Sequence, residues 1–128
     1  MKNSLKISLL SLLIPLMITP KASAHEVGMR AAIQVRASNG SLITYSETTL
    51  PRNVQVTNIT ITVRYSTGEA MAHGRIKIFA PGDSVNPWKT GVLNAQGQYT
   101  FSPNLARRGR WTVYVESEGH SNFLNVLL

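Results

Sequence analysis

Three histidines are the side chains in this sequence best suited to chemistry: His25, His73 and His120. Imidazole is the commonest protein ligand for metals near neutral pH. We expect cleavage of the chain after Ala24, which makes His25 the first residue and places its α-amine beside its ring nitrogen. Together these two groups chelate one metal ion, and a second imidazole completes a three-nitrogen site that suits Cu(II) or Ni(II).

Two residues are candidates for the second imidazole. His120 lies in a turn after the last strong core strand, where a loop can bring it to the N-terminus, and His73 lies at the start of a strand. We therefore predict His25, His120 and His73 as metal ligands. The alternative is that each is an ordinary surface or hydrogen-bonded histidine. Met29 and Met71 are soft enough to bind Cu(I), although methionine more often fills gaps in a core.

The sequence contains no recognisable catalytic set. Its six acidic residues are scattered, mostly beside turns, so no pair of carboxylates is placed for general acid–base catalysis. There is no cysteine and no G-x-S-x-G motif, and the glycines punctuate strands instead of forming a phosphate-binding loop. The sequence therefore predicts a protein that is not an enzyme and that has neither disulfides nor thiolate metal sites.

Residues 1–24 have the pattern of a secretory signal peptide. Two lysines make the start positive, residues 7–18 are mostly apolar, and residues 22–24 (Ala-Ser-Ala) form a small-residue cleavage site. The apolar run of twelve residues is shorter than the roughly 20 residues that cross a bilayer. We therefore predict a signal peptide followed by one domain at residues 25–128, which is extracytoplasmic (periplasmic or secreted) and soluble after cleavage.

The charge of the chain gives little sign of a nucleic-acid partner. The whole chain carries a net charge of +7, and without residues 1–24 its ten basic and six acidic residues leave +4. The dense basic cluster is Arg107, Arg108 and Arg110, beside Trp111. A single loop neutralises few phosphates, and surface charge of this kind is usually only solvated. We expect no nucleic-acid partner.

Four runs of alternating apolar and polar residues must form the framework that positions these side chains. Such alternation is typical of strands with one buried face. Trp111, Val113 and Val115 share one face of the last run, whereas Phe79 faces away from Ile78 in the second. Two packed sheets cover such faces, so we predict an all-β fold, a small antiparallel β-sandwich. The runs are residues 60–65, 75–80, 98–102 and 110–116.

Weaker patterns surround this framework. Residues 54–65 are typical of one long strand, or of two strands with a bend near Asn58. Residues 31–37 alternate weakly, which predicts an edge strand, with residues 41–46 pairing back across an Asn-Gly turn. The remaining expectations are a short strand at residues 88–93, a final strand or tail at residues 123–128 and one helical turn at residues 104–106.

An ordered series of short motifs resembles a known family. The motifs are G-E-x-M-A at residues 68–72, K-I-F-A-P-G-D at 77–83, N-P-W-x-T-G at 86–91, L-N-A-x-G-x-Y-x-F-x-P at 93–103, G-R-W-T-V-x-V at 109–115 and G-H at 119–120. Over residues 60–120 the chain is similar to exported carboxypeptidase-regulatory-like proteins. These accompany bacterial nickel and cobalt uptake transporters and are often called nickel transport accessory proteins.

The resemblance implies a seven-stranded transthyretin-like or immunoglobulin-like sandwich that acts beside a membrane permease for a transition metal. It also implies a mature chain that begins at or close to a histidine, as His25 would here. His120 matches the family's Gly-His, whereas His73 falls where the family varies. The chain departs from the family at Asn94, where an aspartate is usual, and in residues 29–53, which do not match it.

Three functions follow as hypotheses. The leading one is an exported accessory protein of nickel or cobalt uptake, which binds a divalent ion, Ni(II) or Co(II), or presents it to a membrane permease. The second is a non-enzymatic extracytoplasmic binding or adhesion module, with Trp88 and the loop at residues 80–87 as its surface. The third is a copper-handling protein that binds Cu(II) through the N-terminal histidine.

Overall fold

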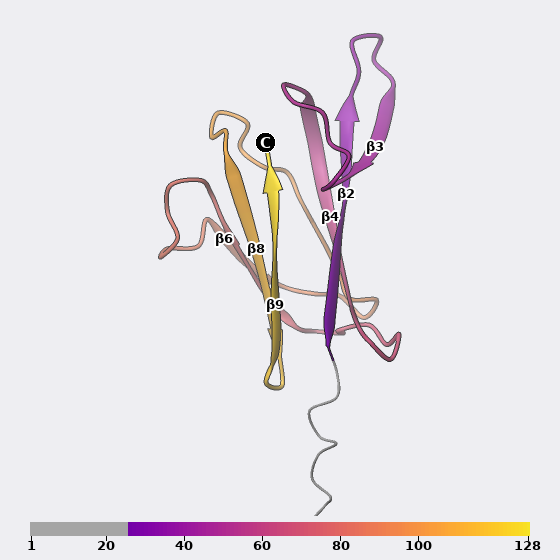
Figure 1. Ribbon diagram of the computed structural model, residues 1–128, viewed down its shortest axis with the longest axis vertical. Coiled ribbons are helices and arrows are strands. Elements are labelled where there is room, and N and C mark those ends of the chain that lie inside the picture. The colour runs from indigo at the N-terminus through magenta and orange to yellow at the C-terminus, as the bar shows by residue number, and fades with distance from the viewer. Residues whose placement is uncertain (1–25) are drawn as a thin grey trace, which may run out of the picture.

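The computed structural model describes residues 26–128, which form eight β-strands and no helix (Figure 1). No membrane-spanning helix is therefore found in this range. The predicted signal peptide and His25 lie outside the described residues. The strands are β2 (Val27–Arg36), β3 (Leu42–Ser46), β4 (Gln55–Tyr65), β5 (Arg75–Phe79), β6 (Lys89–Val92), β7 (Gln98–Phe101), β8 (Arg110–Ser117) and β9 (His120–Leu127).

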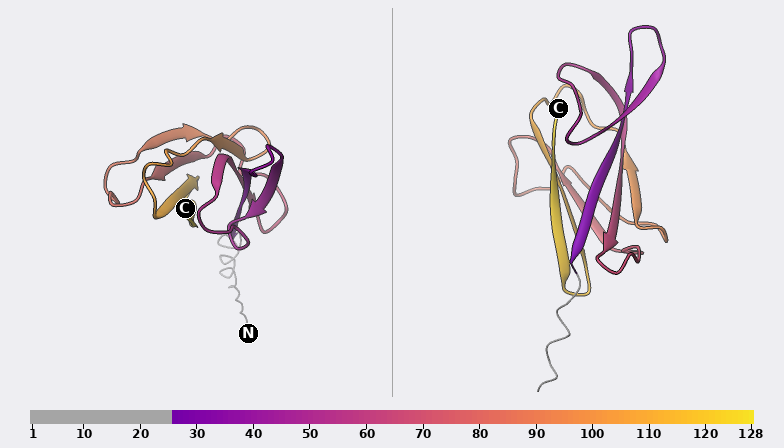
Figure 2. Two further views of the ribbon diagram at one scale, coloured as in Figure 1. Left: turned by 90° about the horizontal axis from the view of Figure 1, so that it is seen from above. Right: turned by 45° about the vertical axis from the view of Figure 1, so that its right-hand side comes forward.

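The strands form two antiparallel sheets that pack against each other. One sheet has the order β3-β2-β4-β7 and the other has the order β6-β5-β8-β9. Figure 2 shows the two layers, and the C-terminal half of the chain supplies all four strands of one of them. The predicted small antiparallel β-sandwich is confirmed, and each of the four alternating runs lies in a strand: β4, β5, β7 and β8.

The core lies between the sheets, because alternate residues of each strand point inward. Trp111, Val113 and Val115 of β8 are wholly buried. In β5, Ile78 is buried and Phe79 lies on the opposite, outer face, as the alternation predicts. The indole Nε1 of Trp111 donates to the backbone oxygen of Arg107 at 3.0 Å, so burial leaves its polar group satisfied.

The N-terminal strand β2 differs most from the sequence-based expectation. We predicted an edge strand at residues 31–37, but β2 has ten residues and lies inside its sheet, between β3 and β4. Its inward side chains are Ala31, Ile33 and Val35, and the small alanine weakens the alternation. The interior position depends on pairing with β4, which a local pattern does not show.

One long strand, β4, takes up residues 55–65, so the single-strand interpretation is correct. In its pairing with β2, Gln34 lies opposite Asn58 and Val35 lies opposite Val56, so the register skips Thr57. This β-bulge is held by two bonds to Gln34. The Thr57 hydroxyl donates to its backbone oxygen at 3.1 Å, and the Asn58 amide donates to its side chain at 3.0 Å. The sheet therefore absorbs the irregularity near Asn58 without breaking the strand.

Three further expectations need correction. Residues 104–106 form a turn, not a helical turn, in which Arg107 N–H donates to the Asn104 carbonyl at 3.0 Å. The last strand begins at His120, because Glu118 and Gly119 alone make the turn, with φ of 50° and 82°. The described range has eight strands, where the family resemblance implies seven.

The turn at Asn94 shows why the missing aspartate does no harm to the fold. Asn94 Oδ1 accepts the backbone N–H groups of Gln96 and Gln98, each at 2.9 Å. An amide oxygen caps this turn as a carboxylate would. Gly97 is required at its end, because its φ is +73° and an added Cβ would lie 2.5 Å from the Val63 carbonyl oxygen.

Candidate functional site

His120 lies where the β8–β9 turn meets the start of β2, at one end of the sandwich (Figure 1). Its half-buried ring stands edge-on to the Tyr65 ring, with the ring centroids 5.2 Å apart and the planes at 67°. Its Nδ1 atom is buried. An edge-to-face contact favours one ring orientation, so His120 is a positioned side chain and not a mobile surface one.

Tyr65 connects His120 to the N-terminal strand. It is the last residue of β4 and pairs with Val27, the first residue of β2. The Val27 carbonyl accepts a hydrogen bond from Asn122 Nδ2 at 2.7 Å, which ties β9 of one sheet to β2 of the other. The start of β2 is therefore held beside the start of β9.

Glu26, the first described residue, is fixed at the same place. Its carbonyl accepts the backbone N–H of Ser66 at 2.8 Å, and its own N–H donates to Ser66 Oγ at 3.3 Å. Ser66 follows Tyr65, the ring partner of His120. His25 lies outside the described residues. Its covalent neighbour Glu26 is anchored to Ser66, which directly follows the ring partner of His120.

His73 and His120 line a common hollow of about 420 Å³, together with Arg75, Glu116 and Glu118. We call it the histidine hollow. His73 is exposed, has φ of +61° and donates its N–H weakly to the Asn94 carbonyl at 3.4 Å. The two histidines meet there because Arg75 pairs with Glu116 on β8, one residue before the Ser117–His120 pair. Such an encounter depends on strand register, so spacing in the sequence does not reveal it.

The charges of the histidine hollow are already partly paired. Glu116 Oε2 accepts from Arg75 at 2.8 Å and Oε1 accepts from the Tyr114 hydroxyl at 3.1 Å. The Arg75 bond, then the Tyr114 bond, lowers the pKa of Glu116 below its ordinary 4.5. Within residues 26–128, no three His, Cys, Asp or Glu side chains are grouped so as to hold a metal ion.

Met29 and Met71, the methionines within residues 26–128, both contact the core. Met71 is wholly buried, and Met29 is half-buried and packs against the core. The burial of Met71 is the gap-filling role that is commonest for methionine. Met29 keeps part of its surface exposed and lines a hollow beside Glu26 and Tyr65.

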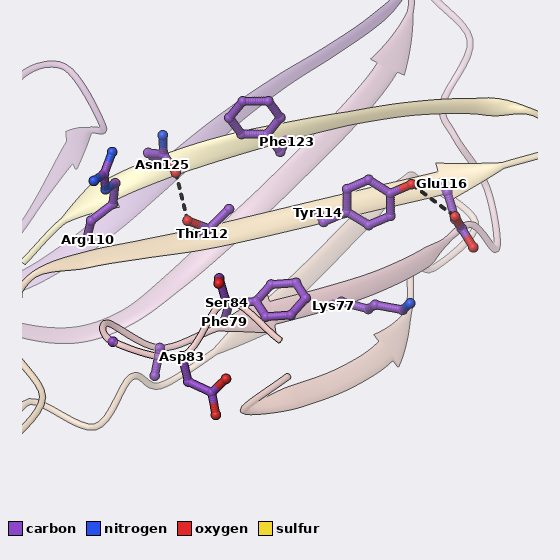
Figure 3. Close-up of a pocket in the computed structure, with 12 residues that line it drawn as sticks. Lys77, Phe79, Asp83, Ser84, Arg110, Thr112, Tyr114, Glu116, Phe123 and Asn125 are labelled. Atoms are coloured by element: carbon purple, nitrogen blue, oxygen red, sulfur yellow. Dashed lines mark hydrogen bonds between the residues drawn. The ribbon is translucent and has the colours of Figure 1, made fainter. Parts of the chain in front are cut away.

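A second hollow of about 860 Å³ lies on the outer face of β5, β8 and β9 (Figure 3). We call it the outer trough. It is lined by the rings of Phe79, Tyr114 and Phe123, by Lys77 and Arg110, and by the loop at residues 82–84. Trp88, expected on the binding surface, is half-buried and packs against Trp111 and Phe101, with centroids 5.0 and 6.2 Å away. The lining of the outer trough includes residues of the loop at 80–87 but not Trp88.

The sequence patterns do not single out Tyr114 or Phe123, although one signal points to Tyr114. It alternates with Trp111, Val113 and Val115 and so must lie on the outer face of the strand.

In comparisons with known proteins, no protein family, no curated protein and no solved structure matches this chain.

Proposed function

We propose that the protein is an exported accessory protein of nickel or cobalt uptake, which binds a divalent ion and presents it to a membrane permease. One observation carries the metal-binding part. The positioned ring of His120 contacts Tyr65, and Tyr65 pairs with Val27, two residues after His25. The similarity of residues 60–120 to nickel transport accessory proteins supports the transport role and the permease partner.

The donor set follows from covalent reach. Glu26 is anchored to the residue after Tyr65, the ring partner of His120. One residue spans at most about 3.6 Å, so the proposal needs only His25, attached to Glu26, to reach the His120 ring. Its amine and imidazole, with the His120 imidazole, provide three nitrogen ligands. Nitrogen ligands of this kind bind divalent metals in the order Co(II), Ni(II), Cu(II), with Cu(II) tightest. His73, across the same hollow, is the additional donor in this arrangement.

Metal titration of the exported protein tests the proposal. Intact-mass measurement on protein recovered from the cell envelope should first show a chain that begins at His25. Calorimetric titration with Ni(II) and Co(II) should then show that His25→Ala and His120→Ala each weaken binding strongly, and that the double variant loses little more. His73→Ala should have a smaller effect. One extra residue before His25 is the matched control, because it moves the α-amine away and leaves every side chain in place.

The outcomes separate the proposed function from its rivals. Binding no tighter than about millimolar, or no effect of the N-terminal extension, means that the histidines are ordinary surface residues. Nickel and cobalt uptake by cells that lack the protein should fall while the permease remains present. A change in copper tolerance, with uptake unchanged, assigns the same chelate to copper handling.

A further inference from the structure

The outer trough, of about 860 Å³, shares Tyr114 and Glu116 with the histidine hollow but contains none of the three proposed metal ligands. Three neighbouring strands each contribute one aromatic ring: Phe79 from β5, Tyr114 from β8 and Phe123 from β9. Tyr114 lies directly opposite Phe123, and Phe79 lies opposite Thr112, one step along the same face. Phe123 is 59% exposed. Rings gathered on a solvent-facing sheet surface are typical of binding sites.

The trough is lined by two cations and two carboxylates. Glu116 is paired with Arg75, whereas Asp83 accepts only neutral backbone N–H groups of its own loop and keeps its negative charge at that wall. Lys77 and Arg110 form no ion pair with any residue from 26 to 128. Lys77 pairs with Tyr114, four residues along β8 from Arg110, which separates the two cations by about 13 Å along the strand.

One wall of the trough is held in a fixed shape. Asp83 Oδ1 accepts the backbone N–H groups of Val85 and Asn86 at 3.0 and 2.9 Å, which closes the loop on itself. The guanidinium of Arg107 donates to the Pro81 carbonyl at 3.0 Å and ties this loop to the one before β8. A preformed wall lowers the entropy cost of binding a ligand.

The floor of the trough is polar between the rings. The Thr112 hydroxyl donates to Asn125 Oδ1 at 2.8 Å, and this bond turns the amide nitrogen of Asn125 toward other acceptors (Figure 3). A ligand that fits must therefore offer apolar faces to three rings, hydroxyl or carbonyl groups to the floor, and negative charge to cations at two separated points.

We propose that the outer trough binds an acidic oligosaccharide, whose sugar rings stack on the aromatic side chains and whose carboxylates meet Lys77 and Arg110. The two cations that form no ion pair favour this ligand, and their separation along the strand suits more than one sugar ring. A peptide strand would need free backbone groups at a sheet edge. The edge strand here is β9, but the rings and cations lie on the face of the sheet, where the central strand β8 is paired on both sides. A nucleic acid would need more than two cations to bind at physiological salt.

Calorimetric titration of the mature protein with a short oligogalacturonate tests the assignment. A neutral maltooligosaccharide of the same length and a single-stranded oligonucleotide serve as the other probes. Saturable binding of the oligogalacturonate should fall about tenfold in the Lys77→Gln, Arg110→Gln double variant and about fivefold in Phe123→Thr. Arg30→Gln and Leu42→Thr are the matched controls on the other sheet and should leave the affinity unchanged. The affinities are compared only among variants whose melting temperature equals that of the wild type.

Each other outcome overturns the proposal. Equal affinity for the neutral oligosaccharide removes the role of the cations, and tighter binding of the oligonucleotide assigns the face to nucleic acid. Loss of binding in the control variants to the same extent as in the trough variants places the ligand elsewhere. Absence of binding at about millimolar oligogalacturonate, or a dimer that Phe123→Thr dissociates, shows that the face does not take a sugar ligand. None of these results depends on metal binding at His25 and His120.

Discussion

The two faces of strand β8 follow the same alternation but obey different constraints. On the inner face, Trp111, Val113 and Val115 are wholly buried. On the outer face, Thr112 and Tyr114 are only half-buried, yet this face also carries aromatic rings from the neighbouring strands. Burial explains the inner residues completely, because they supply the core. It does not explain the outer rings, since a solvent-facing sheet surface needs only polar or β-branched residues.

The comparison is tested most severely on the inner face. Trp111→Ala removes the largest buried side chain and should lower the free energy of unfolding by about 3–5 kcal/mol. Thermal or urea unfolding of the two proteins measures the difference. A loss below about 1 kcal/mol would mean that the inner face tolerates a cavity and that the contrast between the faces is false.

The fold was predictable where burial is periodic along the chain. The faces of β8 and β5, with Trp111 inside and Phe79 outside, follow from alternation alone. The interior position of β2 does not, because its partner β4 begins only at Gln55, well beyond the end of β2 at Arg36, and Ala31 gives little apolar signal. The bulge at Thr57 is likewise a property of two strands together, so neither strand shows it separately.

The candidate sites were less predictable, because they are assembled by register. The sequence indicated His25, His73 and His120 as candidates, and the structure places the last two around one hollow. His25 lies outside the described residues, so the structure does not test it as a ligand. The outer trough combines residues from positions 77 to 125. Its rings are distant in sequence and become neighbours only when β5, β8 and β9 pair.

Gly91, on the inner face of β6, offers a second test of the contrast between the two faces, with a smaller expected loss of stability. Gly91 of β6 pairs with the buried Ile76, and an added Cβ would lie 2.5 Å from the Tyr99 ring of the opposite sheet. Gly91→Ala should therefore destabilise the protein by about 1–3 kcal/mol through overpacking. Thr90→Ala is the control, since Thr90 is exposed beside Lys77 on the outer face. Equal losses in denaturant unfolding would contradict the assignment of faces.

A substitution on the outer face should barely change stability. Phe123→Thr keeps a strand-forming residue at a position that is 59% exposed, so the free energy of unfolding should change by about 0.5 kcal/mol or less. Val126→Thr on the same strand places a hydroxyl at a site that is 1% exposed and should cost about 1–3 kcal/mol. Urea titrations of both variants give the comparison. A large loss in Phe123→Thr would show that the outer rings serve the fold after all.

The smallest expected effect concerns charge on the outer face. The hydrogen bond from Arg75, and then that from Tyr114, lowers the pKa of Glu116 below 4.5, which means that folding favours the ionised carboxylate. A group whose pKa is depressed in the folded protein stabilises it above the unfolded-state pKa and loses that contribution as pH falls through the folded-state pKa. The Arg75 and Glu116 side chains are 73% and 31% exposed, so solvent screens the pair and its contribution is small. Glu116→Gln should therefore be slightly less stable than the wild type at neutral pH, and the two unfolding curves should converge below pH 4.5 as the carboxylate is protonated. Raising the salt concentration at neutral pH should shrink the same difference. A difference that persists at low pH would mean that Glu116 acts through packing, as the residues of the inner face do.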